Sequence, residues 1–371
     1  MREYLFVLIF AAAASFTLTP LVRGAAVRFG ALTPVRDRDV HASPIPRLGG
    51  IAMFGGFVVA LFVASHLRFL SGVSRDSTDL RAVLSGAALV CLLGVVDDLW
   101  TLDAVTKLAG QVLAAGVMVV QGVQLVSLPV VVTTILPTPV LVTITVLLVV
   151  VTMNAVNFVD GLDGLAAGIV GISATAFFAY SYSISKDYAP NVFSVSSLVA
   201  ASLIGCCLGF LPHNFNPARI FMGDSGSMLL GLLLSAATIS LVGNIDPSTL
   251  TGGQLPAGAL YLFPLLVPAA VLVVPFLDLV LAVVRRTRAG RRPWHPDAQH
   301  LHHQLLGLGL SHARAVMALY LWTAMVAIGA AGFAVLPTSW AVAIVLLFGV
   351  LAVGFTLPRA RIGLASHTGR L

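Results

Sequence analysis

Residues 82–98 read Ala-Val-Leu-Ser-Gly-Ala-Ala-Leu-Val-Cys-Leu-Leu-Gly-Val-Val-Asp-Asp, an apolar run that ends in two adjacent acids. Such an uncharged stretch is typical of a helix that crosses a bilayer, because about 20 mostly apolar residues span the hydrocarbon core. At least eight separate runs in the chain are apolar over fifteen or more residues. A buried helix of a soluble protein explains one such run, but not eight.

The composition leads to the same conclusion. Of the 371 residues, 58% are apolar and only 10% charged, with a mean hydropathy of +0.99, far from the averages of soluble domains. The net charge of +6 does not indicate nucleic acid, because the arginines cluster between the apolar runs, as the positive-inside rule predicts. Cys91, Cys206 and Cys207 lie within apolar runs, so neither a disulfide framework nor a zinc knuckle is expected.

We therefore expect an all-α integral membrane protein, a polytopic bundle of about eleven transmembrane helices in a single transmembrane domain over residues 1–371. The first run is interpreted as a retained helix rather than a signal peptide, because Arg23 and Arg28 and many further spans follow it. A short hairpin is expected over the Val- and Thr-rich residues 126–136. The predicted spans are 4–22, 49–65, 82–96, 107–126, 138–153, 164–183, 193–211, 226–243, 258–283, 315–335 and 340–357.

Alternate connections between these spans must lie on opposite sides of the membrane. One set, 23–48, 97–106, 154–163, 212–225, 284–314 and the tail from 358, is assigned sixteen basic residues, against five for the other set. This asymmetry predicts a plasma-membrane protein with its N-terminus outside, its C-terminus cytoplasmic and the first set of loops facing the cytoplasm. The five basic residues on the other side are Arg2, Arg68, Arg75, Arg81 and Lys186.

The polar residues that could do chemistry fall almost entirely in the predicted cytoplasmic loops, which favours one composite site built from five loops. The candidates are His41, Arg47, Asp97, Asp98, Asn154, Asn157, Asp160, Asp163, Arg219, Phe221, Asp224, His300, His302 and His303. Asp278 lies inside an apolar run near Arg285, which can neutralise it, so it is left out of the site.

Two groups of acids each allow two interpretations. Asp97 and Asp98 either mark the water interface or form a carboxylate pair that binds a cation or takes a proton. In residues 154–164, Asp163 can cap the following helix, but capping alone does not explain two asparagines and two aspartates in an otherwise apolar stretch. Amide and carboxylate oxygens suit a hard cation, or the edge of a pyrimidine.

Residues 219–227 contain Asp224-Ser-Gly-Ser, which should open a helix whose free backbone amides attract phosphate. Asp224 would repel phosphate unless a divalent metal stands between them, the alternative being a simple N-cap. The histidines at 300–303 fit zinc, a pocket for pyrophosphate or sugar lined with arginines, or a loop that contacts anionic lipid headgroups. His41 and Arg47 permit a similar anion contact.

Carboxylates, helix N-terminal amides and arginines on one membrane face favour magnesium-dependent transfer or hydrolysis that involves a diphosphate and a lipid. No Walker loop, dinucleotide fingerprint or nucleophile elbow is present.

Two other functions need similar residues. A transporter would be expected to place ionisable groups near the bilayer midplane. A lipid diphosphate phosphatase shares the metal chemistry but releases inorganic phosphate.

The order of these motifs over residues 20–315 resembles the polyprenyl-phosphate N-acetylhexosamine-1-phosphate transferase family. The resemblance implies that Asp224 and Asn157 bind Mg²⁺, with Mn²⁺ as an alternative, and that Asp97 binds or deprotonates the lipid phosphate beside Asp98. The implied substrate-binding residues are Lys107 with Gln111 in a Lys-x-x-x-Gln pattern, Asn154, Asp160, Asp163, Phe221 near the uracil, and Arg219 and the three histidines at the diphosphate and sugar.

The branch that uses UDP-MurNAc-pentapeptide usually carries a lysine where this chain has Thr101, and its histidine loop differs from residues 292–303 here. The resemblance therefore implies transfer of GlcNAc-1-phosphate from UDP-GlcNAc to undecaprenyl or decaprenyl phosphate in the bilayer. UMP and polyprenyl-diphospho-GlcNAc would be the products, in the first membrane step of a cell-wall or surface polysaccharide pathway. No nucleic-acid partner is expected, and a homodimer is left open.

Overall fold

The computed structural model describes residues 1–33, 44–126, 136–187, 194–243 and 301–357, the strand residues 128–130 and 132–134, and scattered helical positions between 269 and 288. His41, His300, Asp278 and the tail from 358 lie outside the described residues, as does most of the predicted span 258–283.

Ten of the eleven predicted spans correspond to helices within the described part of the chain. Eight of these helices are long and apolar enough to cross a membrane, whereas α2 and α5 are shorter apolar helices. The chain is thus a multi-pass membrane protein. The helices are α1 (Arg2–Arg28), α2 (Gly49–Ala64), α3 (Leu70–Asp76), α4 (Thr78–Trp100), α5 (Ala104–Val120), α6 (Thr138–Val159), α7 (Leu165–Asp187), α8 (Ser194–Asn214), α9 (Gly223–Gly243), α11 (Leu301–Gly307), α12 (His312–Val335) and α13 (Thr338–Thr356).

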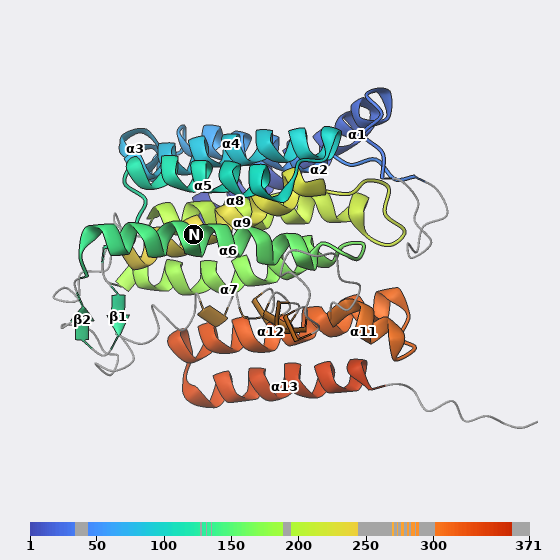
Figure 1. Ribbon diagram of the computed structural model, residues 1–371. Coiled ribbons are helices and arrows are strands. Elements are labelled where there is room, and N and C mark those ends of the chain that lie inside the picture. The colour runs from blue at the N-terminus through green and yellow to red at the C-terminus, as the bar shows by residue number, and fades with distance from the viewer. Residues whose placement is uncertain are drawn as a thin grey trace, which may run out of the picture.

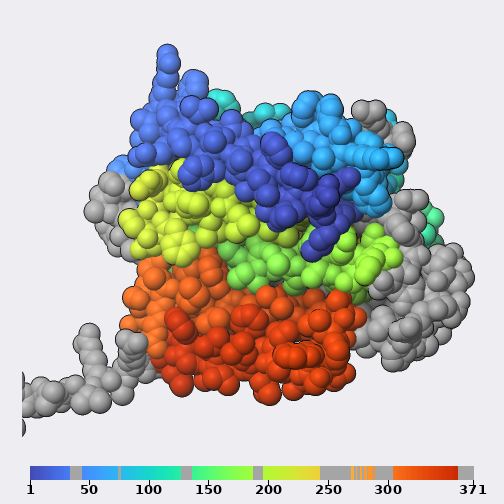
Figure 2. All heavy atoms as spheres, turned by 180° about the vertical axis from the view of Figure 1, so that it is seen from behind, coloured from blue at the N-terminus to red at the C-terminus, as the bar shows by residue number. Residues whose placement is uncertain are grey.

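The long helices run roughly side by side (Figure 1). Seen from behind, α1 and the pair α12 and α13 lie on opposite sides of the molecule, with α8 and α7 between them (Figure 2). Helix α9 occupies the interior, where it packs against α4, α6 and α8, and the apolar window of this helix is buried throughout. Its position matters for the site, because α9 begins at Gly223, next to Asp224.

Small residues let these helices approach closely, as membrane helices require when no hydrophobic driving force acts between them. On α8, Gly205 and Gly209 face α1, and a Cβ atom added to either would lie 2.4 Å from the Leu8 carbonyl oxygen or 2.1 Å from that of Ala12. On α9, Gly231 packs in the same way against the backbone of Met153 in α6. The glycines thus set the spacing of the helices around α9.

The predicted hairpin is confirmed. Strands β1 (Leu128–Val130) and β2 (Val132–Thr134) pair antiparallel, with Leu128 opposite Thr134. The hairpin joins α5 to α6 at one end of the bundle (Figure 1).

Several helices run further than the hydropathy predicts, and the added turns carry the polar candidates. Helix α4 continues through Asp97 and Asp98, α6 through Asn154 and Asn157, and α9 starts before Asp224. The expectation that these residues lie in loops is therefore wrong. Neighbouring helices supply partners for the side chains of these residues, and Asp98 also supplies one for the Asp224 amide at the start of α9.

Candidate active site

The site forms where the end of α4 meets the start of α9. Asp98 is buried, and one oxygen of its carboxylate accepts a hydrogen bond from the Asp224 amide at 2.9 Å. The other oxygen accepts from the Ser225 amide at 3.2 Å and the Ser225 hydroxyl at 2.9 Å. Asp98 therefore caps α9 from another helix, and the positive end of the α9 dipole stabilises its charge.

This cap corrects one expectation from the sequence. The amides of Asp224 and Ser225 were expected to be free for phosphate, but Asp98 already occupies both. Because both carboxylate oxygens are engaged in this way, Asp98 holds α9 in place and does not present them to an open substrate site.

Glycine allows the two helix ends to come this close. A Cβ atom on Gly94 of α4 would lie 2.2 Å from the Ser225 Cα atom. Gly223, with φ +70°, adopts a left-handed conformation that a side chain disfavours, and a Cβ atom there would collide with the Asp98 carboxylate. At the start of α2, Gly50 donates its amide to the Met222 carbonyl at 2.9 Å, so the first predicted site loop joins the same region.

Lys107 links two acids across the site. Its ammonium lies 2.9 Å from Asp97 Oδ2 and 2.8 Å from Asp224 Oδ2. The other oxygen of Asp97 accepts from the Leu102 amide at 2.6 Å, which fixes the turn after α4. Asp103 caps α5 by accepting from the amides of Val105 and Thr106, so Lys107 is held one turn into a well-defined helix.

Asn157 completes the surroundings of Asp224. Its side-chain amide donates to Asp224 Oδ1 and, at 2.8 Å, to the Ser227 hydroxyl. Behind it, the Asn154 amide donates to Gln111 Oε1 at 2.7 Å, and Gln111 donates to the Met228 sulfur at 3.1 Å. Side chains from α5, α6 and α9 are therefore joined in two groups of contacts, one around Asp224 with Asn157 and Lys107, and one formed by Asn154, Gln111 and Met228.

Two further residues connect the loop after α6 to the loop after α8. Asp163 accepts from the Asn216 side chain at 2.9 Å and the Ala218 amide at 3.0 Å. Asn214 is buried, accepts from the Gly164 amide at 3.0 Å and donates to the Ile220 carbonyl at 3.0 Å. Asn214 was given no role from the sequence, although its position within a polar Asn-Phe-Asn stretch was a usable signal. Both residues order the loops around the site.

Asp160 is half-buried at the C-terminal cap of α6. Burial raises the pKa of its carboxyl to about 8; repulsion by Asp224, Asp98 and Asp163 adds to this shift, whereas Arg47 opposes it. Because this pKa lies far above that of a free aspartate, a neutral carboxyl that can donate a hydrogen bond is favoured near pH 7.

The remaining candidates lie around this centre. Arg47 donates to the Thr33 hydroxyl at 2.7 Å, Arg219 is exposed, and the backbone of Phe221 pairs with Pro46 and Gly49. His302 and His303 belong to α11, but their side chains, like all of His41 and His300, lie outside the described part of the chain. The structure thus gathers Asp97, Asp98, Lys107, Asn154, Asn157 and Asp224, and leaves the histidine contacts as predictions.

The side chains around Asp224 determine whether the site suits a divalent metal. Among the described residues, no three His, Cys, Asp or Glu side chains are grouped around one point. Mg²⁺, however, typically takes only one or two carboxylates and completes its octahedron with waters and substrate phosphates. The partly exposed Asp224 carboxylate, with the Asn157 amide beside it, fits that requirement.

Comparisons with known proteins identify relatives of this chain. The glycosyl transferase family 4 model matches residues 80–242, from α4 through α9. The chain is 46% identical to the decaprenyl-phosphate N-acetylglucosaminephosphotransferase of Mycolicibacterium smegmatis over 89% of this chain and 82% of that protein. It is 35% identical to a probable undecaprenyl-phosphate N-acetylglucosaminyl 1-phosphate transferase of Bacillus subtilis, over 82% and 77% of the two chains. It is also 31% identical to the phospho-N-acetylmuramoyl-pentapeptide-transferase of Desulforudis audaxviator, over 80% and 86%.

Proposed function

Since this chain belongs to glycosyl transferase family 4 and is related over most of its length to polyprenyl-phosphate sugar-phosphate transferases, we propose that it transfers GlcNAc-1-phosphate from UDP-GlcNAc to a polyprenyl phosphate. The observation that carries the proposal is the position of Lys107 between Asp97 and Asp224 at the meeting point of α4, α5 and α9. Lys107 supplies a cation for phosphate oxygens, and Asp224 would need a divalent metal to offset its negative charge toward the two phosphates.

In the proposed reaction, an oxygen of the polyprenyl phosphate attacks the phosphorus that bears the sugar. The bond from that phosphorus to the oxygen bridging the two phosphates breaks, and UMP leaves with that oxygen. Lys107 offers its ammonium to the phosphate oxygens as they gain charge, and Asp97 holds Lys107 in position. The hydrogen bond from the Asn157 side chain keeps Asp224 aimed at the same point.

We further propose that Mg²⁺ is the cofactor, with Mn²⁺ able to replace it. Asp224 and Asn157 would hold the ion, with the Asn157 amide turned so that its oxygen faces the metal. When bound, the ion would neutralise the diphosphate oxygens and the leaving UMP. Chelation by EDTA should therefore abolish UMP release, and added Mg²⁺ should restore it.

The site is proposed to face the cytoplasm of the plasma membrane. The helix ends at the site connect to the set of loops that was assigned sixteen basic residues. The positive-inside rule predicts that this more basic side is cytoplasmic. Attaching a reporter to the tail after residue 357 and testing its accessibility in intact cells would check this orientation.

Two observations favour GlcNAc over MurNAc-pentapeptide as the transferred sugar. Identity to the two GlcNAc-type relatives is 46% and 35%, against 31% to the pentapeptide transferase. In addition, Thr101 stands where the pentapeptide branch usually has a lysine.

The test is to incubate purified protein with Mg²⁺, decaprenyl or undecaprenyl phosphate and either UDP-GlcNAc or UDP-MurNAc-pentapeptide, and to measure UMP and the lipid product. Formation of UMP and polyprenyl-diphospho-GlcNAc from UDP-GlcNAc alone is expected. UMP from the pentapeptide substrate alone would overturn the choice of sugar, and inorganic phosphate in place of UMP would indicate a phosphatase instead.

A further inference from the structure

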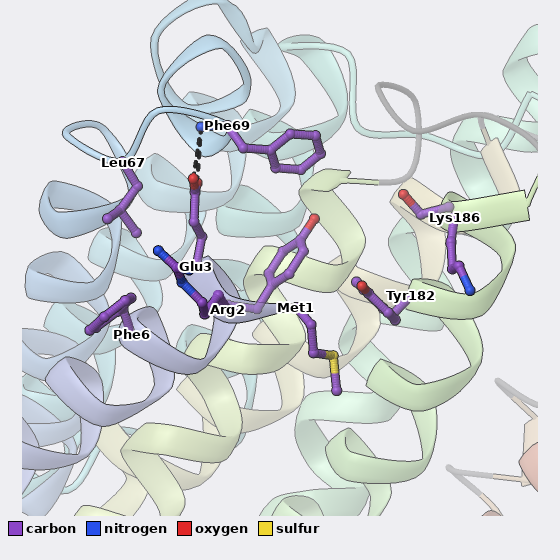
Figure 3. Close-up of a pocket in the computed structure, with 10 residues that line it drawn as sticks. Met1, Arg2, Glu3, Phe6, Leu67, Phe69, Tyr182 and Lys186 are labelled. Atoms are coloured by element: carbon purple, nitrogen blue, oxygen red, sulfur yellow. Dashed lines mark hydrogen bonds between the residues drawn. The ribbon is translucent and has the colours of Figure 1, made fainter.

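A cavity of about 570 Å³ lies at the opposite end of the bundle from the Asp97–Asp224 cluster. It is bounded by the start of α1, the connection after α2 and the end of α7 (Figure 3). Helix α7 begins beside Asp163 and is 23 residues long, so its far end lies about 35 Å from the site. This cavity is therefore separate from the proposed reaction site.

Two cations line this cavity. Arg2 of α1 and Lys186 of α7 are both exposed and lie on opposite sides of the cavity in the view of Figure 3. The acid among the lining residues, Glu3, has its carboxylate engaged, because it accepts from the amides of Phe69 at 3.0 Å and Leu70 at 2.9 Å. Glu3 keeps its negative charge but is turned toward these amides, and the two cationic side chains outnumber this one acid in the lining.

The placement of these cations is unusual for this chain. Only five basic residues are assigned to this side of the membrane, and two of the five line one cavity. The rest of the lining is largely apolar and aromatic and includes Phe6, Phe69 and Tyr182. The side chains of Phe6 and Phe69 are 45% and 49% exposed, so apolar surface is available beside the charges.

We propose that this cavity binds an anionic phospholipid. Its phosphate would lie near Arg2 and Lys186, and its glycerol and upper acyl chains would lie against Phe6 and Phe69. The location supports a lipid rather than a soluble anion: α1 begins and α7 ends here, at the level where membrane helices meet headgroups, and aromatic residues such as Tyr182 favour that interface. Basic residues near a membrane surface each contribute about a fivefold gain in affinity for anionic lipid.

The experiment measures binding rather than catalysis, so its result is independent of the proposed reaction. Delipidated protein in neutral detergent is titrated with phosphatidylglycerol, phosphatidylcholine or inorganic phosphate, while thermal unfolding and lipid adducts in native mass spectrometry are recorded. The variant Arg2→Gln/Lys186→Gln removes both cations. Arg68→Gln is the matched control, because Arg68 is an exposed cation of the same connection that does not line the cavity.

Phosphatidylglycerol is expected to raise the unfolding temperature of the wild type and of Arg68→Gln, and to bind the double variant about 25-fold more weakly. Equal binding to all three proteins, or equal binding of phosphatidylcholine and phosphatidylglycerol, would overturn the proposal. Equal protection by inorganic phosphate would show that the cavity takes a free anion, and would overturn it as well.

Discussion

Replacing Asp98 by asparagine tests whether this acid holds the α9 helix in place. The carboxylate accepts three hydrogen bonds, from the Asp224 amide and from the amide and hydroxyl of Ser225. Asparagine has almost the same size, but it turns one accepting oxygen into a donor that faces another donor. A buried unsatisfied group costs about 1–3 kcal/mol, and we expect Asp98→Asn to lower the free energy of unfolding by about that amount.

The assay is unfolding in detergent without substrate or added metal, followed by UMP release. Asp103→Asn is the matched control, because Asp103 also caps a helix, α5, but is exposed, and asparagine is an equally good N-cap at such a position. This control should change stability by less than about 0.5 kcal/mol. If Asp98→Asn abolished UMP release but left the protein as stable as the wild type, Asp98 would be a reacting group and the capping argument would be refuted.

Three further substitutions probe the contacts around this junction. Lys107→Gln leaves two acids without their shared cation and should reduce UMP release at least about 100-fold, the usual cost of a lost charge-stabilising group; full activity would exclude Lys107 from the site. Asn157→Ala should raise the Mg²⁺ concentration needed for half-maximal rate at least about tenfold, and an unchanged Mg²⁺ titration would contradict the assigned ligand. Gly94→Ala should reduce the yield of folded protein on size exclusion, because its Cβ would lie 2.2 Å from Ser225, whereas Gly116→Ala meets open space and should be tolerated; equal yields would contradict the close packing of α4 and α9.

The membrane helices could be predicted because each depends on local composition alone. The run at 82–96 is apolar whatever lies beside it, and so are nine other predicted spans that became helices. The helix ends were predicted less well. Hydropathy ends a span at the first acids, but Asp97 and Asp98 continue α4 because groups from α5 and α9 donate hydrogen bonds to their carboxylates. Such partners come from tertiary contacts, which a single span does not reveal.

The sequence predicted which residues lie at the site better than it predicted what each of them does. Asp97, Asn157 and Asp224, which the loop pattern assigned to one face, lie close to one another, and Lys107, which only the family resemblance implicated, lies between Asp97 and Asp224. The role of Asp98 could not be predicted, because it depends on how the end of α4 docks on the start of α9. Asn214 was missed for the same reason, since its partners, Gly164 and Ile220, belong to two different loops.

We place sugar-phosphate transfer at the cluster around Asp224. The most direct test is UMP release from UDP-GlcNAc by the wild type, Asp224→Asn and Asp103→Asn, each confirmed as folded by size exclusion and supplied with Mg²⁺ and polyprenyl phosphate. We expect Asp224→Asn to lose at least about 100-fold in rate, in line with other groups that stabilise charge in a transition state, and Asp103→Asn to keep the wild-type rate. A folded Asp224→Asn protein that releases UMP as fast as the wild type would show that transfer does not depend on this cluster.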